Sequence, residues 1–320
     1  MTRDSRQRYD VIVIGLGAFG SAAVYWGARR GLRVLGLERY EFGHARGASE
    51  DHSRIVRRSY ASADYVRFTA ESFATWDELA AEAGEQLITL TGGLDLFPDD
   101  PWDDPADYRA AMDAEGVPYE VLDAGELMRR WPQWRVPDGI TAISQADAGV
   151  IAASRANEAH RRLARARGAD LMAETRVLGI AEDPRLGFTV ETSHGTFRAD
   201  ALVVTADSWT NEVLAPLGVS LPLRLLQEQV TYFDAADPAP SSRPRSPCGS
   251  GTARRRSTGC RRSAGPGPRS PSTAAGPRSR RSRGPSSPIR GTPPWSSDSF
   301  ASTSPPRTVR PSRCGPACTR

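Results

Sequence analysis

The sequence predicts an α/β fold with a mainly parallel sheet, followed by a long unstructured tail. In the segment from Asp10 to Gly15, residues 11–14 form a short run of β-branched apolar residues that is followed by glycine, which is typical of a strand buried on both faces of a parallel sheet. A helical stretch and a second apolar run at residues 33–37 complete a strand-helix-strand unit. Near residue 240 the composition changes abruptly, and this change marks the expected end of the folded part.

A glycine motif connects the first strand to the first helix. Gly15, Gly17 and Gly20 have the spacing G-x-G-x-x-G. The first glycine permits a tight turn, the second lets backbone N–H groups approach a pyrophosphate, and the third allows close packing of helix and strand. Glu38 ends the second strand, where its carboxylate can accept hydrogen bonds from a ribose 2′-hydroxyl. The unit therefore predicts a Rossmann-type nucleotide-binding domain.

The segment that follows Glu38 distinguishes between possible cofactors. A Ser-Arg-Ile-Val-Arg run occupies residues 53–57, where a nicotinamide dehydrogenase would continue with another plain strand. This stretch resembles the monomeric sarcosine oxidase and N-methyltryptophan oxidase family, which are FAD-dependent amine oxidases of the D-amino-acid oxidase superfamily. An NAD(P)-type dehydrogenase that uses the same glycine motif is the alternative interpretation.

Further segments resemble the same family in the same order along the chain. They are residues 91–97, 130–132 and 146–150, an amphipathic helix at 154–167, and residues 175–177 and 199–209. In the family, the backbone at the position of Val177 holds the adenine. The family prefers glycine at the position of Asp207, so we expect less room for close backbone approach at that turn. The resemblance covers about residues 8–235.

The resemblance implies a discontinuous domain organisation. A Rossmann-type FAD-binding domain is expected from residues 1–85 and 145–220. A partial substrate domain with an antiparallel sheet is expected from residues 86–144 and 221–240, and residues 241–320 form the disordered tail.

The resemblance also implies a reaction and a set of site residues. Family members oxidise an N-methyl amino acid, such as sarcosine or N-methyltryptophan, with O₂ to an imine and H₂O₂, and the imine hydrolyses to formaldehyde and the amino acid. By position, Arg57 would hold the substrate carboxylate and Arg54 would lie beside the flavin. Alternatively, Arg54, Arg57 and Arg58 form a solvated helix start. The residues expected to bind FAD are Gly15, Leu16, Gly17, Ala18, Phe19, Gly20, Glu38, Arg39, Ser53, Arg54, Val177, Thr205, Ala206 and Trp209.

The tail differs in composition from the rest of the chain. Of the 80 residues from 241 to 320, 17 are Arg, 18 Ser, 14 Pro and 9 Gly. Too few large apolar side chains remain to offset the entropy of ordering such a segment. One explanation is an arginine-rich tail that binds RNA or another polyanion. The other, which we favour, is a shifted reading frame in a GC-rich gene, which would leave an impaired form of the oxidase without the family's catalytic lysine.

Charge and cysteine usage bear on partners and compartment. The chain has no Lys, and residues 1–240 carry 25 Arg against 37 acidic residues, so the basic excess belongs to the tail. The first 240 residues contain no Cys, and no apolar run reaches the length of a membrane span. We expect a cytoplasmic monomer without metal or membrane partners, and without nucleic acid unless the arginine-rich tail is genuine. His44, His160 and His194 have no catalytic neighbours in the sequence and are expected at the surface or in loops.

Overall fold

The computed structural model describes residues 8–49, 51–101, 103–226, 230, 232, 247–251 and 258–259. All of these residues belong to a compact unit that extends from Met1 to Gly265. Most of the predicted tail, and with it the polyanion and reading-frame hypotheses, lies outside the described residues.

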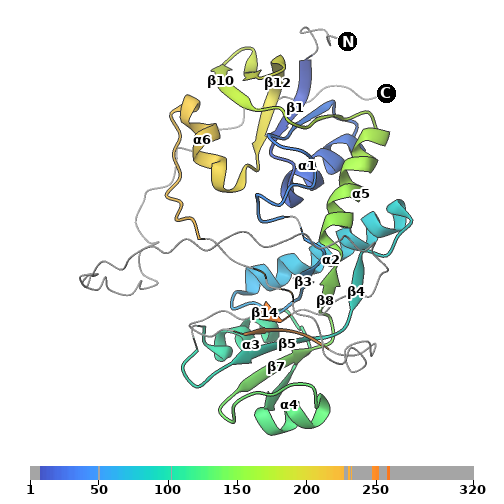
Figure 1. The fold of residues 1–320 in the computed structure, drawn as a ribbon, viewed down its shortest axis with the longest axis vertical. Coiled ribbons are helices and arrows are strands. Elements are labelled where there is room, and N and C mark those ends of the chain that lie inside the picture. Colours follow the sequence, from blue (N-terminus) through green and yellow to red (C-terminus); the bar gives the residue numbers. More distant parts are fainter. Residues whose placement is uncertain are drawn as a thin grey trace, which may run out of the picture. The chain divides into compact units, whose positions relative to one another are not determined.

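A six-stranded sheet contains the predicted strand-helix-strand unit (Figure 1). Four of its strands, β12, β1, β2 and β9, are parallel neighbours, and β10 and β11 extend the β12 edge as antiparallel strands. In spatial order the strands are β10 (Val177–Asp183), β11 (Gly187–Thr192), β12 (Gly195–Val204), β1 (Arg8–Ile14), β2 (Val34–Leu37) and β9 (Asp170–Met172). The predicted Rossmann-type α/β fold is therefore confirmed.

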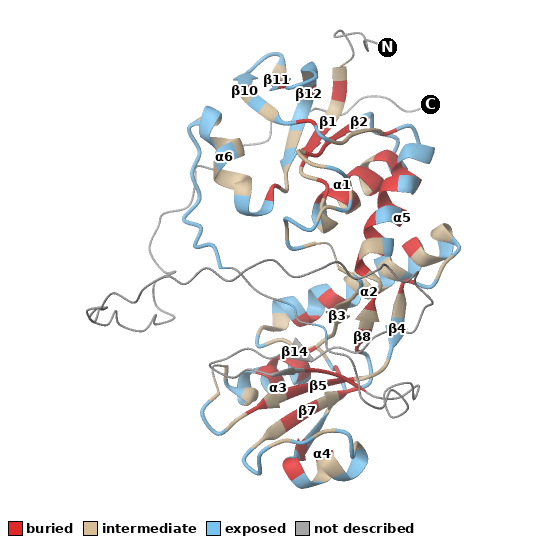
Figure 2. Ribbon diagram, in the orientation of Figure 1, coloured by how far each residue is buried: buried red, intermediate tan, exposed pale blue. Residues whose placement is uncertain are grey.

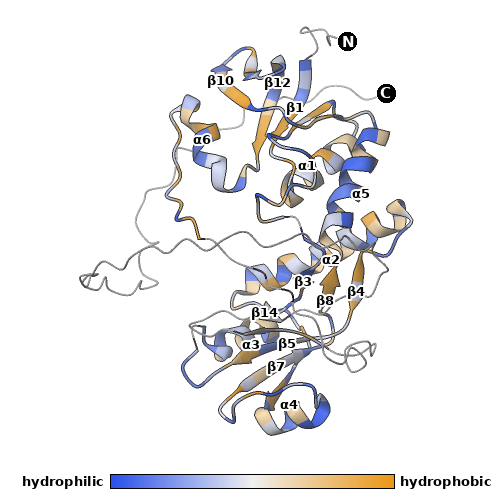
Figure 3. Cartoon of the chain, viewed as in Figure 1, coloured by the Kyte–Doolittle hydropathy of each residue, from blue (hydrophilic) through white to orange (hydrophobic). Residues whose placement is uncertain are grey.

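Both faces of β1 are buried, as the apolar run predicts. On one face, Val13 packs in a core with Val24 and Tyr25 of helix α1 (Ala18–Arg29) and Leu163 of helix α5 (Ala153–Ala166). On the other face, Ile12 belongs to a second core. Figure 2 shows β2 and much of β1 as buried, and Figure 3 shows many hydrophilic residues along α5.

Two smaller sheets are formed mainly by residues between the two halves of the large sheet. The five-stranded sheet consists, in spatial order, of β14 (Thr258–Gly259), β13 (Cys248–Gly251), β5 (Gly93–Phe97), β7 (Thr141–Gln145) and β6 (Glu120–Asp123). The three-stranded sheet consists of β3 (Arg54–Val56), β8 (Gly149–Ile151) and β4 (Ile88–Leu90). The pairs β5–β7 and β6–β7 are antiparallel, in agreement with the expected substrate-domain sheet.

Three of the remaining helices begin or end at residues with suitable chemistry. Asp104 and Asp123 are N-caps whose carboxylates accept backbone N–H groups in the first turns of α3 and α4. Helix α2 ends at Gly84, which has the left-handed φ of 69° that favours glycine. These elements are α2 (Ala63–Ala83), α3 (Pro105–Ala114), α4 (Ala124–Arg130), α6 (Thr210–Leu214) and the 3₁₀ turns η1 (Asp207–Trp209) and η2 (Ala215–Leu217). Among the described residues, no helix has both the length and the apolar character that a membrane span requires.

The structure corrects the expected start of the unstructured tail. Cys248–Gly251 forms β13, which pairs in parallel with β5, so that Cys248 lies opposite Gly93. Strand β5 has β7 on its other side, so β13 satisfies the backbone groups that would otherwise be unpaired at this edge. Cys248 is also buried, which places its side chain in the fold. Disorder from residue 241 onward is therefore wrong for residues 247–251 and 258–259.

Two local predictions from the sequence are also wrong. The arginine triplet is no solvated helix start, because Arg54 begins β3, which pairs with β8, and α2 begins only at Ala63. His160 is no surface residue, because it is 3% exposed and packs between the rings of Tyr25 and Trp76. Its position on α5 is three residues before the buried Leu163, which puts both side chains on the helix face that contacts the core.

Candidate functional site

Three segments converge at the N-terminus of α1. Gly15 has a φ of 93°, and a Cβ atom on it would lie 2.6 Å from the carbonyl oxygen of Thr205. A Cβ atom on Gly17 would lie 2.7 Å from Oγ of Ser49. The glycine turn, residues 47–49 and the turn after β12 are therefore packed too closely for side chains at these glycines.

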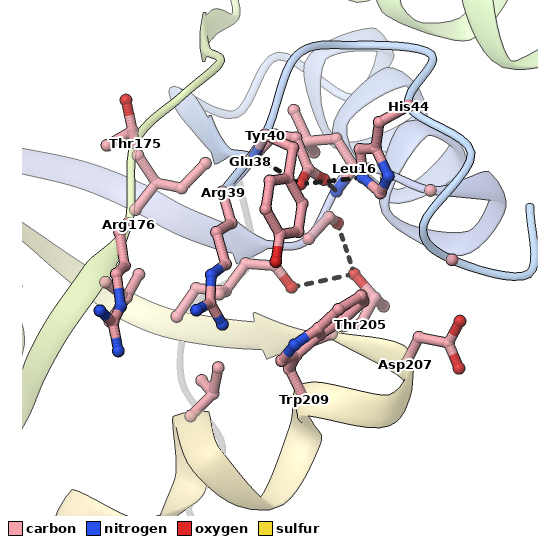
Figure 4. Close-up of a pocket in the computed structure, with 18 of the residues that line it drawn as sticks. Leu16, Glu38, Arg39, Tyr40, His44, Thr175, Arg176, Thr205, Asp207 and Trp209 are labelled. Atoms are coloured by element: carbon pink, nitrogen blue, oxygen red, sulfur yellow. Dashed lines mark hydrogen bonds and ion pairs between the residues drawn. The ribbon is translucent and has the colours of Figure 1, made fainter. Parts of the chain in front are cut away.

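These segments form one end of a pocket at the carboxyl ends of β1, β2 and β12 (Figure 4). The pocket contains about 980 Å³ of space, including the part that is open to solvent. It is lined by Ile14, Gly15, Leu16, Gly17, Leu37, Glu38, Arg39, Tyr40, Glu41, Phe42, Gly43, His44, Gly47, Ala48, Ser49, Thr175, Arg176, Val177, Leu178, Gly179, Thr205, Ala206, Asp207, Trp209, Glu212, Val213 and Pro216. In open α/β sheets, ligands bind at this edge.

Glu38 is fixed at the centre of the pocket wall. Its Oε2 accepts the backbone N–H of Leu16 at 2.8 Å, and its Oε1 accepts that of Tyr40 at 3.1 Å. Nε2 of His44 lies 3.2 Å from the same Oε1. A carboxylate has about four acceptor positions, so these three contacts orient Glu38 and leave it about one position that can accept a ribose hydroxyl.

The other end of the pocket carries an ion-pair cluster. Nη1 of Arg39 lies 3.1 Å from Oε2 of Glu212, and Nη2 of Arg176 lies 3.1 Å from Oε1. Burial acts to raise the pKa of Glu212, but the hydrogen bonds from the two arginines more than offset it and hold this pKa below its usual range. The rings of Tyr40 and Trp209 meet edge to face beside this cluster, as Figure 4 shows. An arginine and aromatic wall of this kind suits a planar base.

The pocket brings together most of the residues that the sequence predicts for the cofactor. Those that line it are Gly15, Leu16, Gly17, Glu38, Arg39, Val177, Thr205, Ala206 and Trp209. Those that do not line it are Ala18, Phe19, Gly20, Ser53 and Arg54. Phe19 is 82% exposed, and Gly20 packs against the backbone of Gly15.

Sequence reasoning missed several lining residues. Tyr40, Arg176 and Glu212 line the pocket, and so does Asp207, which the sequence marked only as a departure from glycine. Arg176 is adjacent to the predicted Val177, so its position along the chain was a usable signal. Glu212 had no comparable signal, because its partner Arg39 lies 173 residues away in the sequence.

The two predicted arginines lie away from this pocket and are held by acids. Nη1 of Arg54 donates to Oδ2 of Asp51 at 2.6 Å, and its Nη2 donates to the carbonyl oxygen of Ala48 at 3.2 Å. Nη1 of Arg57 lies 2.6 Å from Oδ1 of Asp95, which is 2% exposed. Burial acts to lower the pKa of Arg57, but the Asp95 carboxylate together with Tyr60 and Tyr108 outweighs it, so this pKa lies above its usual value.

The other side of Asp95 completes a small polar network. Ser59 Oγ donates to Oδ2 of Asp95, and Nε2 of Gln145 lies 3.5 Å from the same oxygen. Gln145 Oε1 accepts the backbone N–H of Arg58 at 2.9 Å. The network thus joins the segment after β3 to β5 and β7. Within the described part of the chain, no group of three or more His, Cys, Asp or Glu side chains could hold a metal ion.

Comparison with known proteins agrees with a dinucleotide pocket. Residues 10–280 match the family model of the FAD dependent oxidoreductases (DAO). The chain is 31% identical to a monomeric sarcosine oxidase from Bacillus sp. (strain B-0618), over 71% of this chain and 58% of that protein. It is 33% identical to an N-methyl-L-tryptophan oxidase from Salmonella arizonae, over 71% of this chain and 60% of that protein.

A solved structure has the same fold. The open form of NikD, an amino acid oxidase essential for nikkomycin biosynthesis, superposes with a TM-score of 0.61 at 33% identity, over 66% of this chain and 55% of that one. The chain thus spans less than two thirds of the length of the relatives that it matches. The match over most of its own length shows that it belongs to the FAD-dependent oxidoreductase (DAO) family, with FAD as its cofactor.

Proposed function

We propose that the chain is an oxidase of N-methyl amino acids, such as sarcosine or N-methyltryptophan, that uses O₂ as electron acceptor. The observation that carries the proposal is the similarity to sarcosine oxidases and N-methyl-L-tryptophan oxidases over about 70% of the chain. The N-methyl carbon gives up a hydride equivalent, which is two electrons and one proton, and the amine nitrogen gives up a second proton, so that an imine forms. The two electrons and two protons reduce O₂ to H₂O₂, and water hydrolyses the imine to formaldehyde and the amino acid. FAD, when bound, supplies the two-electron acceptor.

The pocket residues fit this cofactor. Gly15 and Gly17 expose the backbone at the N-terminus of α1, which favours a pyrophosphate. Glu38 would accept hydrogen bonds from the ribose, and the backbone at Val177 would contact the adenine. The hydrogen bond from the backbone N–H of Leu16 already orients the Glu38 carboxylate, so this side chain needs to move little when FAD binds.

We expect the purified full chain to bind FAD non-covalently and weakly. The resemblance implies a last glycine-rich flavin contact after residue 240, beyond the segments of the sequence that resemble the family, and the chain covers only 58% and 60% of two of its relatives. The visible absorbance of the purified protein, before and after addition of FAD, measures this binding. A colourless protein that binds NADH and not FAD would contradict the cofactor and favour the dehydrogenase alternative.

We expect an Arg57→Lys substitution to lower kcat/KM for the N-methyl amino acid by about tenfold to several hundredfold, because lysine loses the two-point fork that binds a carboxylate. The fold should survive, since lysine can still pair with Asp95. Because we favour a shifted reading frame near residue 240, the measurement uses an enzyme with that frame restored. Resequencing across codons 236–250 tests whether the shift exists, and an intact frame through Arg320 would contradict it.

The neighbouring arginine provides the matched control. Arg58 is partly buried and lies 3.5 Å from Asp147, so Arg58→Lys removes an equivalent guanidinium one residue away. We expect this variant to keep its kcat/KM. Flavin content should be unchanged in both variants. If Arg57→Lys leaves the affinity for a carboxylate inhibitor unchanged, Arg57 is not the substrate clamp.

A further inference from the structure

Asp207 has an unusual conformation at the pyrophosphate end of the pocket. Its φ is 48°, in the left-handed region that non-glycine residues rarely occupy, and it lines the pocket beside Thr205 and Ala206. Figure 4 shows its carboxylate at the opposite side from Arg39 and Arg176. A strained residue in a binding pocket calls for a compensating contact.

That contact is a hydrogen bond to the opposite wall of the pocket. Oδ2 of Asp207 accepts the backbone N–H of Ala48 at 3.0 Å. A Cβ atom on Gly47 would lie 3.4 Å from the same oxygen. The carboxylate thus binds a backbone N–H group of the segment 47–49. The same segment packs close to the start of α1, because a Cβ atom on Gly17 would lie 2.7 Å from Oγ of Ser49.

A pyrophosphate bound at the start of α1 would share its end of the pocket with the Asp207 carboxylate. Helix α1 has no acidic residue in its first turn, and its N-terminus is where a pyrophosphate binds. Both arginines that line the pocket are bound to Glu212 at the other end. Arg54 donates to the carbonyl oxygen of Ala48, but the carboxylate of Asp51 balances the charge of Arg54.

We propose that the Asp207 carboxylate is an internal competitor for the pyrophosphate of the cofactor. It takes the N–H of Ala48, which a phosphate oxygen could otherwise accept, and it adds a like charge beside the start of α1. Asp207 therefore lowers the affinity of the chain for FAD. This inference concerns the cofactor and is independent of the substrate proposed above.

The test compares Asp207→Asn and Asp207→Gly with the unaltered full chain. Asparagine removes the charge, keeps the shape, and can still accept from Ala48, whereas glycine also relieves the positive φ. FAD affinity is measured by quenching of flavin fluorescence and by calorimetry at low and high salt. We expect Asp207→Asn to bind FAD about tenfold more tightly at low salt, because it removes a like charge from the end of the pocket that would hold the pyrophosphate, and the difference should shrink at high salt.

Two controls isolate the effect of the charge. Asp200→Asn removes a carboxylate that pairs with Arg8 and does not line the pocket, so it should leave FAD affinity unchanged. Adenosine has no pyrophosphate, so its affinity should be the same in the unaltered chain and in Asp207→Asn.

Three results would overturn the proposal. In the first, Asp207→Asn binds FAD no more tightly than the unaltered chain, so that the hydrogen bond to Ala48 has no effect on binding or preorganises the pocket. In the second, only Asp207→Gly gains affinity, which assigns the effect to backbone strain. In the third, none of the proteins binds FAD. By contrast, a chain that binds FAD as expected but oxidises no N-methyl amino acid contradicts only the proposed function.

Discussion

An alanine at position 20 is expected to destabilise the fold by about 3 kcal/mol or more and to abolish FAD binding. The added Cβ atom would lie 1.8 Å from the carbonyl oxygen of Gly15 and 2.7 Å from Oγ1 of Thr205. The first of these is a backbone atom of the turn that follows β1, so it cannot rotate away. The N-terminus of α1 would have to move by more than an ångström from the glycine turn, and its N–H groups would leave the pocket.

A second glycine in the same helix gives the matched control. A Cβ atom on Gly27 would lie 3.0 Å from Cγ2 of Val34, which is the end of a side chain and can give way. Alanine also favours a helix over glycine by about 1 kcal/mol. We therefore expect Gly27→Ala to change the free energy of unfolding by less than about 1 kcal/mol.

Urea unfolding and FAD titration of the two variants measure the difference. Equal stability of Gly20→Ala and Gly27→Ala would show that α1 does not pack on the glycine turn as closely as the structure has it.

The parts of the site that could be predicted from sequence are those encoded locally. The turn at Gly15 and Gly17 and the acid at Glu38 lie within one strand-helix-strand unit, where the spacing of residues determines the geometry. The resemblance to amine oxidases then supplied Val177 and the segment up to Trp209, because each lies inside a matched run of residues.

The parts that could not be predicted depend on partners far away in the sequence. Nothing near Arg57 indicates Asp95, because the two meet only when β5 lies beside the segment after β3. The sequence shows that Asp207 stands where the family prefers glycine. It does not show the hydrogen bond to Ala48, because the two residues are 159 positions apart in the chain. Cys248 belongs to a stretch whose composition is typical of disorder, yet it lies in β13, which pairs with the edge of β5.

Lowering the pH from 7.5 to 5 is expected to reduce the stability of the folded chain by about 2 kcal/mol through His160 alone. Burial, followed by the charge of Arg161, lowers the pKa of His160 from 6.5 to about 4. The unfolded chain therefore binds the proton first as the pH falls. The stabilising contribution is fully present above pH 6.5 and is lost progressively as the pH falls toward 4.

A His160→Phe substitution separates this contribution from other acid effects. Nδ1 of His160 has no hydrogen-bond partner among the described residues, so phenylalanine leaves no partner of that atom unpaired. It also keeps a ring between Tyr25 and Trp76, whose centroids each lie 5.4 Å from that of His160. The free energy of unfolding in urea is measured for both proteins at pH 7.5 and 5.

Between pH 7.5 and 5, the free energy of unfolding of the variant should fall by about 2 kcal/mol less than that of the unaltered chain.

Glu126 provides a control, because its carboxyl titrates below this pH range. Hydrogen bonds from Arg129 and Arg130 lower the pKa of this partly exposed carboxyl to about 2, so its contribution is lost only as the pH falls below 4.5. Glu126→Gln should therefore leave the change between pH 7.5 and 5 as it is. If His160→Phe follows the same pH dependence as the unaltered chain, His160 takes up a proton as readily in the folded chain as in the unfolded one, and α5 does not bury it against α1.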